Sequence, residues 1–437
     1  MKLKEYLPLA EILVNELIGQ IDLGDTSLKE AEEKIVKFVY RIGHMMLEEV
    51  VRSVSEPTIE NRLEVEGKAA RYKDTQNMRF KNRFGKEIIR KRRRYAVEGE
   101  DRSYFPLDEK LGLDQCQGFS PLMTYLMAFF GGCEPYVGAA KMLSKALGFS
   151  VSSTAEQNNT EKTGERIDHH PYKAISVKKQ GEECDLMVVE IDGTMSPQIH
   201  EEEGVTGHES LKQPTEYKEC NVVVIEKANK DGGIFDRWVG AQYGPREFFE
   251  NYVRQTGIQM GQMRAKEVVF LADGAKNNWE IQQTNFPDAI PILDFYHAME
   301  HLGHFCFLFQ KEQKGKRAYA KWRDMLREGD VFQVLEEMRC SRDDDVSNRN
   351  EAQKHINYFE NNKWRMKYDE YRERGYPIGS GIVEGQCKLV VGKRFKGNGM
   401  RWKKKDNEAV LDDRLAVLNN TLDGYFVPKP REFRFVS

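Results

Sequence analysis

Short apolar runs and longer stretches of helical spacing alternate along residues 184–309 of the chain. Three apolar runs come first and predict three consecutive strands, because each is short and ends in turn-forming residues. Stretches with apolar positions three and four residues apart then alternate with two further apolar runs, which predicts helix, strand, helix, strand and helix. This order predicts a mixed sheet with helices on its faces. The predicted strands are CDLMVVEID, NVVVIEKA, RWVGAQYG, KEVVFLADG and AIPILDFYH.

The same order of elements is typical of a ribonuclease-H-like α/β fold. We therefore predict a catalytic core of this kind over residues 184–309 and 376–420. Residues 310–375 are rich in charge and contain no strand pattern, so we expect them to form a helical insertion between the two parts of the core.

The first part of the chain predicts a helical segment over residues 1–60 and a DNA-binding region over residues 61–167. Ser27 and Glu30 have the spacing of a capping box at the start of a helix. The stretch FGKEIIRKRRRYAV is the best strand candidate in the second region, and three short helices follow it. The last of them is polar and begins after a GFSVSS turn, which resembles the recognition helix of a helix-turn-helix. These helices are SPLMTYLMAFFGG, PYVGAAKMLSKALG and SSTAEQNNTEKTGERI.

Two of the predicted strands end in an aspartate followed by a glycine, at Asp192 and Asp273. A carboxylate at the end of a buried run must reach solvent, a partner or a metal, because burying it unpaired is costly. Taken singly, each Asp-Gly pair is also what a turn after a strand would use. In the predicted fold the first and fourth strands are neighbours, so the two aspartates are expected to lie together at one end of the sheet.

A third acid, Glu384, follows the glycine-rich turn in YPIGSGIVEGQCK. On its own it is equally an acid in the first turn of a helix, where it would complement the helix dipole. A helix after the insertion would instead bring it to Asp192 and Asp273. Three converging carboxylates repel one another and favour a bound cation, and hard oxygen ligands select Mg²⁺ or Mn²⁺. Two such ions suit in-line phosphoryl transfer.

Positive charge is concentrated in two runs, residues 79–94 and residues 388–405, although the formal net charge of the chain is -3. Segregated positive charge is typical of a protein that binds a polyanion, here DNA, and the alternative is two solvated faces. Trp402 would either stack on a base or pack in the protein. The candidate DNA-binding residues are Arg90, Lys91, Arg92, Arg93, Arg94, Lys388, Lys393, Arg394, Lys396, Arg401 and Lys403.

The sequence resembles insertion-sequence transposases of the DDE class, in particular the ISKra type, over residues 79–420. The stretches that carry the resemblance are VVEIDGTM, LADGAKNNW, ILDFYHAMEHL and YPIGSGIVEGQCKLVVGKRFKGNGMRW, together with RKRRRY and YFPLDEKLGL upstream. The resemblance implies a catalytic triad of Asp192, Asp273 and Glu384 that binds Mg²⁺ or Mn²⁺. It also implies DNA partners, namely terminal inverted repeats and target DNA, and a homo-oligomer. The implied chemistry is hydrolysis at the element end, followed by attack of the 3′-hydroxyl on target DNA.

The segment DFYH, from Asp294 to His297, matches a D-x-x-H motif found after the second acid in mutator-like and related transposases. Its strand comes fifth, so we prefer Asp273 as the second ligand and keep Asp294 as its rival. Asp294, His297, His301 and His304 would share one face of a helix. That face permits a metal cluster, but a structural or DNA-positioning role is the better prediction.

Other features of the sequence narrow the class of protein. No apolar run reaches the length of a membrane span, and the amino-terminal stretch lacks a cleavage pattern, so we expect a cytoplasmic, bacterial protein that joins the nucleoid when bound to DNA. The seven cysteines form no C-x-x-C pair, although related families often have amino-terminal zinc-binding cysteines. Two alternatives stay open: a structure-selective nuclease with the same acids, and an inactive, domesticated DNA-binding protein.

Overall fold

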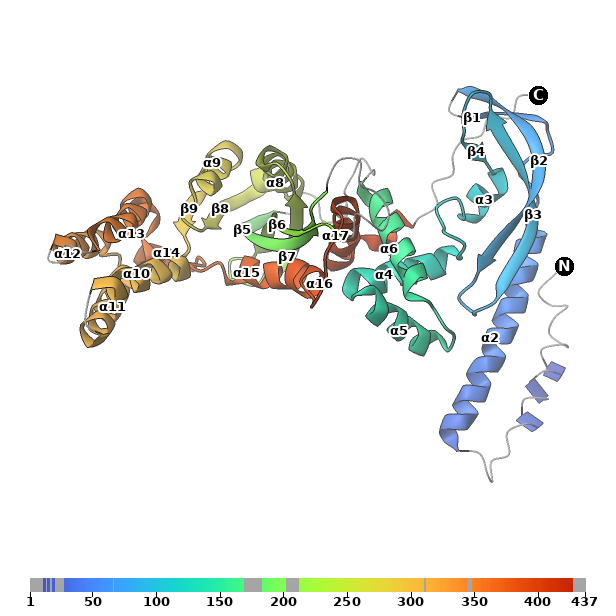
Figure 1. The fold of residues 1–437 in the computed structure, drawn as a ribbon, viewed down its shortest axis with the longest axis horizontal. Coiled ribbons are helices and arrows are strands. Elements are labelled where there is room, and N and C mark those ends of the chain that lie inside the picture. Colours follow the sequence, from blue (N-terminus) through green and yellow to red (C-terminus); the bar gives the residue numbers. More distant parts are fainter. Residues whose placement is uncertain are drawn as a thin grey trace. The chain divides into compact units, whose positions relative to one another are not determined.

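A computed structural model describes the chain at residues 11–12, 14–15, 18–19, 27–65, 67–168, 183–201, 212–309, 312–343 and 348–426. Much of the predicted amino-terminal helical segment, residues 1–60, therefore lies outside the described residues. The chain divides into two compact units (Figure 1). The first comprises residues 1–131, 136–159 and 425–437, and the second comprises residues 132–135 and 160–424.

The first unit contains a four-stranded antiparallel sheet in the order β1-β2-β3-β4. The predicted strand is present as β3, but the sequence did not predict the other three strands. In β2 only Ala70, Met78 and Phe80 are buried, so polar residues conceal the alternation that identifies a strand. The strands are β1 (Arg62–Val65), β2 (Lys68–Lys81), β3 (Glu87–Val97) and β4 (Ser103–Tyr104).

Helices precede and follow this sheet. The predicted capping box is present at the start of α2, where the Ser27 hydroxyl accepts the Glu30 N–H and the Glu30 carboxylate accepts the Ser27 N–H. The three predicted helices that follow the sheet are confirmed as α4, α5 and α6, and one further short helix, α3, precedes them. These helices are α2 (Leu28–Ser53), α3 (Pro106–Leu111), α4 (Pro121–Cys133), α5 (Tyr136–Leu147) and α6 (Ser153–Asp168).

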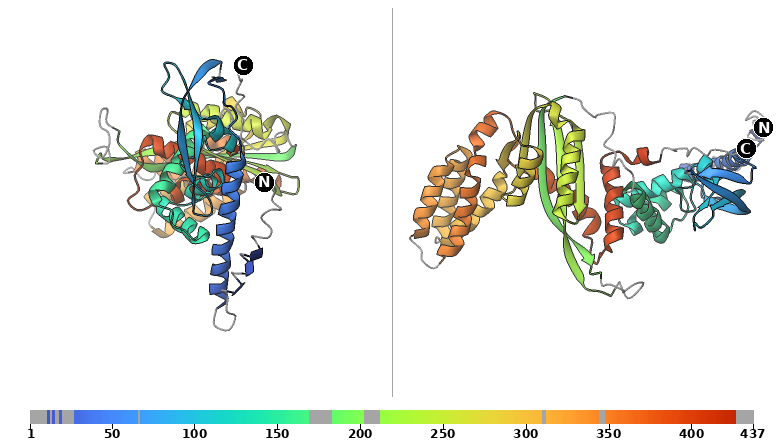
Figure 2. Two further views of the ribbon diagram at one scale, coloured as in Figure 1. Left: turned by 90° about the vertical axis from the view of Figure 1, so that its right-hand side faces the viewer. Right: turned by 90° about the horizontal axis from the view of Figure 1, so that it is seen from above.

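The second unit is built on a five-stranded mixed sheet in the order β7-β6-β5-β8-β9 (Figure 2). The first three strands form an antiparallel meander, whereas β5, β8 and β9 are parallel to one another. The prediction that the first and fourth strands are neighbours is confirmed by the pairing of β5 with β8. The strands are β5 (Cys184–Ile199), β6 (Thr215–Ala228), β7 (Ile234–Tyr243), β8 (Ala265–Ala272) and β9 (Ile290–Leu293).

Helices cover both faces of this sheet (Figures 1 and 2). Helices α8 (Arg246–Met260) and α9 (Lys276–Asn285) lie on one face. On the opposite face, α15 (Gly381–Cys387) continues through a π-helical turn at Lys388–Gly392 into α16 (Lys393–Phe395). Helix α17 (Lys404–Leu418) follows. The mixed α/β architecture agrees with the prediction.

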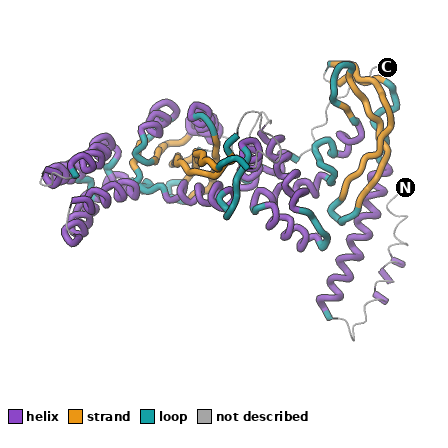
Figure 3. The backbone as a smooth tube through the Cα atoms, in the orientation of Figure 1, coloured by secondary structure: helices purple, strands orange, loops and turns teal. Residues whose placement is uncertain are grey.

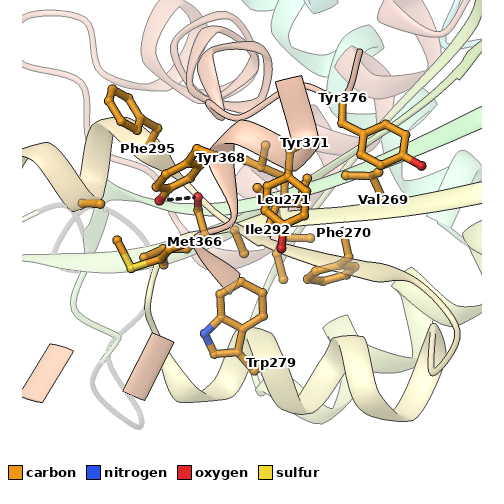
Figure 4. Close-up of a cluster of buried hydrophobic side chains, with 14 of the residues drawn as sticks. Val269, Phe270, Leu271, Trp279, Ile292, Phe295, Met366, Tyr368, Tyr371 and Tyr376 are labelled. Atoms are coloured by element: carbon orange, nitrogen blue, oxygen red, sulfur yellow. Dashed lines mark hydrogen bonds between the residues drawn. The ribbon is translucent and has the colours of Figure 1, made fainter. Parts of the chain in front are cut away.

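The segment between the two parts of the core is helical, as predicted (Figure 3). In its described residues, 312–343 and 348–375, every regular element is a helix. Tyr368 lies in this segment, is fully buried, and donates its hydroxyl to the carbonyl of Leu293 at 3.0 Å (Figure 4). Helix α10 (Phe295–Phe309) ends the first part of the core. The elements of the segment are α11 (Glu312–Arg327), α12 (Val331–Asp343), α13 (Arg349–Asn362), the 3₁₀ turn Lys363–Arg365 and α14 (Tyr368–Glu373).

The apolar core of the second unit lies between the sheet and these helices. Phe270 of β8 packs against Trp279 of α9, with ring centroids 6.4 Å apart, and Leu271 points to the opposite face (Figure 4). Burial of alternate strand residues on both faces holds the end of β8 in one position. None of the helices that the structure describes is both long and apolar enough for a membrane span.

Candidate active site

Asp192 does not end its strand as the sequence predicted, because β5 continues through it to Ile199, whereas Asp273 directly follows the last residue of β8. Ile191 of β5 pairs in register with Ala272 of β8, so the residue that follows each of them along the chain is one of the two aspartates. Burial raises the pKa of the Asp192 carboxyl, and the negative charge of Asp273 raises that pKa further. The Gly193 N–H donates to Asp192 Oδ1 at 2.7 Å and opposes this shift only in part. The predicted proximity of the two acids is therefore present.

The orientation of Asp273 is set by the start of α9. Its Oδ1 accepts the Ala275 N–H at 3.0 Å and the Asn278 side-chain amide at 2.7 Å. The glycine after Asp273 is required by close packing, since a Cβ on Gly274 would lie 2.1 Å from the ring of Tyr358. These two hydrogen bonds occupy Oδ1 of Asp273 and fix the orientation of its carboxylate.

Asp294, the rival to Asp273, is buried and already saturated with hydrogen bonds. It accepts the N–H groups of Tyr296 and His297 at the start of α10. It also accepts both the N–H and the hydroxyl of Ser380, and it forms an ion pair with the His297 ring at 3.1 Å. A carboxylate with this many donors is a structural link between α10 and the glycine-rich turn. The geometry therefore favours Asp273 as the second acid.

Glu384 lies on the helix that the sequence predicted, but its side chain is exposed and pairs with Lys388 at 2.6 Å. The residues of α15 that contact the sheet are its neighbours. The Val383 N–H donates to Glu190 at 2.9 Å, and the Cys387 thiol contacts Asp192 Oδ2 at 3.6 Å. Helix α15 is thus held against the strand of Asp192, while the Glu384 carboxylate is directed to Lys388.

The sequence analysis missed Glu190, which lies two residues before Asp192 on the same face of β5. Glu190 is buried, and its Oε1 has no hydrogen-bond partner among the described residues. Burial raises the pKa of its carboxyl to about 8, and the nearby charges of Glu226 and Asp294 act in the same direction. A glutamate inside the apolar run VVEID was a visible anomaly of the sequence, because such runs rarely bury an acid.

The carboxylate oxygens at this site are of the kind that a hard cation prefers, but fewer than three carboxylates of the described chain converge. Asp192 and Asp273 supply carboxylate oxygens that repel each other without a cation, and Asp273 Oδ2 accepts no hydrogen bond from the described residues. Mg²⁺ and Mn²⁺ prefer such oxygens. Among the described residues, no group of three or more histidine, cysteine, aspartate or glutamate side chains is arranged to hold a metal. Only two carboxylates from the described part of the chain lie together here, because Glu384 is paired with Lys388.

The histidines after Asp294 divide into two groups, so the described structure does not form the metal cluster that their shared helical face permitted. His297 pairs with Asp294, as described above. His301 contacts His355 of α13 through ring nitrogens 3.1 Å apart and stacks on Tyr358 at 3.7 Å, while His304 stacks on His355. Burial lowers the pKa of His301 to about 4, which keeps the ring neutral. These contacts attach α13 to α10 beside the acids.

We expect the pair of His297 and Asp294 to make stability depend on pH. The hydrogen bond to Asp294 raises the pKa of His297 from 6.5 to about 9 in the folded protein. Because the folded pKa is the higher one, the stabilisation is complete below pH 6.5 and is lost as the pH rises through about 9. In EDTA, His297→Gln should therefore lower the free energy of unfolding more at pH 6 than at pH 10.

The measurement is urea unfolding of wild type and variant at both pH values. The exposed His200, which also faces a glutamate, supplies the control variant His200→Gln. A loss for His297→Gln that is equal at the two pH values would contradict the prediction.

The five candidate residues of the first run, 90–94, lie on β3, and four of the five contact other parts of the first unit. Arg90 donates to the carbonyl of Val54, and Arg92 pairs with Asp108. Arg93 donates to the Tyr95 hydroxyl and to Asn61, and Arg94 binds Asp74 through two parallel hydrogen bonds of 3.0 and 2.7 Å. These contacts stabilise the sheet, and Lys91 is the exposed one of the five candidate residues.

Part of the second basic run, residues 388–405, contacts β5, the strand of Asp192. Lys396 donates to the hydroxyl of Thr194, two residues after Asp192, at 2.7 Å. Arg394 is fully buried, with its guanidinium 5.1 Å from the ring centroid of the packed Trp402. Because Arg394 is buried, its guanidinium is out of reach of a phosphate. Trp402 is buried as well, so it packs in the protein and its ring is not free to stack on a base. Three further members have these partners: Lys388 with Glu384, Lys393 with Glu134, and Arg401 with the Gln213 carbonyl. Lys403 occupies the N-cap position of α17, where its side chain makes no capping hydrogen bond.

Comparisons with known proteins place the chain in a family. A model of the uncharacterised protein family UPF0236 matches residues 24–425, and the chain belongs to that family. The sequence matches no curated protein. Among solved structures, the Drosophila P element transposase strand transfer complex is similar at 12% identity and a TM-score of 0.26, over 73% of this chain and 82% of that chain. So low a TM-score does not establish a common fold.

Proposed function

We propose that this protein is a DNA transposase of the DDE class with a ribonuclease-H-like core. The observation that carries the proposal is the pair of acids, Asp192 within β5 and Asp273 directly after the parallel strand β8, at the same level of the sheet. The sheet order supports it, because a meander of three antiparallel strands followed by two parallel strands is the arrangement expected of that core. The resemblance of the sequence to ISKra-type elements supplies the substrate class, DNA ends and target DNA.

Asp192, Asp273 and Glu384 would hold Mg²⁺ or Mn²⁺ in this proposal. When bound, such an ion activates the attacking oxygen and stabilises the leaving oxygen of a phosphodiester. Asn278 holds Asp273 in place, and Asp294 holds the turn before α15 in place. Glu384 must turn from Lys388 toward the aspartates, a change that costs little because exposed ion pairs four residues apart on a helix contribute only about 0.3–0.5 kcal/mol.

The basic side chains beside the acids would position DNA. Lys396 lies next to the strand of Asp192, and Lys388 would become available once Glu384 turns to the aspartates. Charged contacts to phosphates fix the register of a duplex without reading its sequence. Recognition of the terminal repeats would fall to the three helices α4, α5 and α6 and to Lys91, which lie in or begin in the first unit.

The experiment that tests this function is an assay of strand cleavage and strand transfer on DNA that carries the ends of the element. Wild-type protein should cleave with Mg²⁺ or Mn²⁺, fail in EDTA, and join the freed 3′-hydroxyl to a target duplex. Cleavage without joining would favour the structure-selective nuclease. Binding to the ends without cleavage, in either metal, would favour an inactive DNA-binding protein.

A further inference from the structure

Helix α2 carries apolar residues on two different sides, and one side packs against its own unit, while on the other side Ala31 is buried and the larger apolar residues are exposed. From Tyr40 onward, the packed side faces the turn between β2 and β3. The Tyr40 ring meets Phe84 at 5.7 Å, and the His44 ring bonds the Asn82 amide at 2.9 Å. Val51 belongs to the apolar cluster that includes Met78 of β2. These contacts fix which side of α2 faces its own unit.

The second side is an exposed apolar stripe, which we call the α2 stripe. Its members are between 44% and 78% exposed. At 100° per residue they fall within about 60° of one another and about 130° from the packed side. A narrow row of exposed apolar side chains on a solvent-facing surface marks a site of interaction. The members are Leu28, Ile35, Val39, Met46 and Val50.

The spacing of the α2 stripe is that of one helix in a coiled coil. Successive members are seven, four, seven and four residues apart, so two rows, Leu28–Val39–Val50 and Ile35–Met46, each repeat every eleven residues. Ile42 lies at the edge of the stripe, between Val39 and Met46. A pattern with this period fits another helix that lies almost parallel or antiparallel to α2.

The length of the stripe selects the partner. Helix α2 has 26 residues, whereas the other described helices have at most 16. The stripe covers residues 28–50, about 33 Å at 1.5 Å per residue. A helix that covers it from end to end must be about as long as α2, and the chain offers such a helix in a second copy of itself.

We propose that two copies of this chain associate through the α2 stripe, helix α2 against helix α2. The proposal does not rest on the transposase function and would hold for a protein that binds DNA without cutting it. The competing occupant of the stripe is the segment that precedes α2 in the same chain, residues 1–26. Experiments that measure molecular mass distinguish the two candidates, because a second copy of the chain changes the oligomeric state and residues 1–26 of the same chain do not.

The first test compares the mass of wild type, Val39→Glu and Ile89→Glu by light scattering over a range of concentrations. Ile89 lies on β3 of the same unit and is 50% exposed against 53% for Val39, so it is a matched control. Wild type and Ile89→Glu should be dimers. Val39→Glu should weaken association on the order of a hundredfold or more, because each dimer would bury two unpaired charges. Both changes are at exposed positions, and circular dichroism should report unchanged folding.

The second test uses cysteine cross-linking in full-length protein with Cys340, the exposed native cysteine, replaced by serine. Val39 is the midpoint of the stripe, so Val39→Cys should form a disulfide dimer whether the helices are parallel or antiparallel. Met46→Cys should do so only in a parallel pair. Lys37→Cys, exposed and off the stripe, is the control. Monomeric wild type at every concentration, or equal cross-linking of Val39→Cys and Lys37→Cys, would overturn the proposal.

Discussion

Asp192→Asn should lower the rate of DNA strand cleavage on the order of a thousandfold or more while the protein stays folded. The expected loss corresponds to several kcal/mol of transition-state stabilisation, the contribution typical of a bound metal ion. Folding should not suffer, because the pKa of Asp192 is raised by burial and by Asp273, which means that its charge destabilises the folded state. An asparagine removes that charge and keeps the shape of the side chain.

The measurement is the single-turnover cleavage rate on DNA ends with Mg²⁺ or Mn²⁺, together with urea unfolding of the same samples. Asp185→Asn is the matched control, since Asp185 lies near the start of the same strand, away from Asp192, and pairs with the exposed Lys266. Cleavage by Asp192→Asn at the wild-type rate would remove Asp192 from the proposed site. A cleavage rate that falls only in proportion to the fraction of folded protein would show that Asp192 has a structural role only.

Three further variants assign the other ligands. Asp273→Asn and Glu384→Gln should lose activity without loss of stability, because both side chains are at least partly exposed. Asp294→Asn should lower stability instead, because Asp294 accepts hydrogen bonds from α10 and from Ser380. If Asp273→Asn still cleaves DNA, and if the folded fraction of Asp294→Asn does not, then Asp294 is the second ligand.

Gly164→Ala should lower the free energy of unfolding of the second unit by about 3 kcal/mol, at the upper end of the usual cost of overpacking. Gly164 lies where α6 meets α17. A Cβ at this position would be 1.8 Å from the carbonyl oxygen of Ala409 and 2.4 Å from its carbonyl carbon. Those atoms belong to the backbone and cannot move aside as a side-chain end would, so the two helices would have to separate.

Gly385→Ala is the control for Gly164→Ala, because it makes the same substitution in a helix that has room for it. No atom lies within 4 Å of a Cβ built on Gly385. Alanine there should raise stability by about 0.5–1 kcal/mol through helix propensity. Urea unfolding followed by circular dichroism should therefore shift in opposite directions for the two variants. A Gly164→Ala transition at or above the wild-type midpoint would contradict the close approach of α6 and α17.

Much of the second unit was predictable because its elements are local patterns. The apolar runs before Asp192 and Asp273 identified β5 and β8, and the glycine-rich turn identified the helix of Glu384. The strands β1, β2 and β4 were missed. β2 buries only three of its fourteen residues, so its alternation is weak along the sequence. Sheets with one solvated face and many polar residues conceal the pattern from which a strand is recognised.

The sequence by itself determined the order of the elements in the second unit and the proximity of two acids on the neighbouring strands β5 and β8, since burial of apolar runs dictates both. It did not show that β5 continues past Asp192 to Ile199. Only the tertiary structure decided which charged residues are available for chemistry. Arg394 is buried, Asp294 is saturated by donors, and burial raises the pKa of Glu190 beside the site. Each of these outcomes depends on partners tens to hundreds of residues away, which no local pattern encodes.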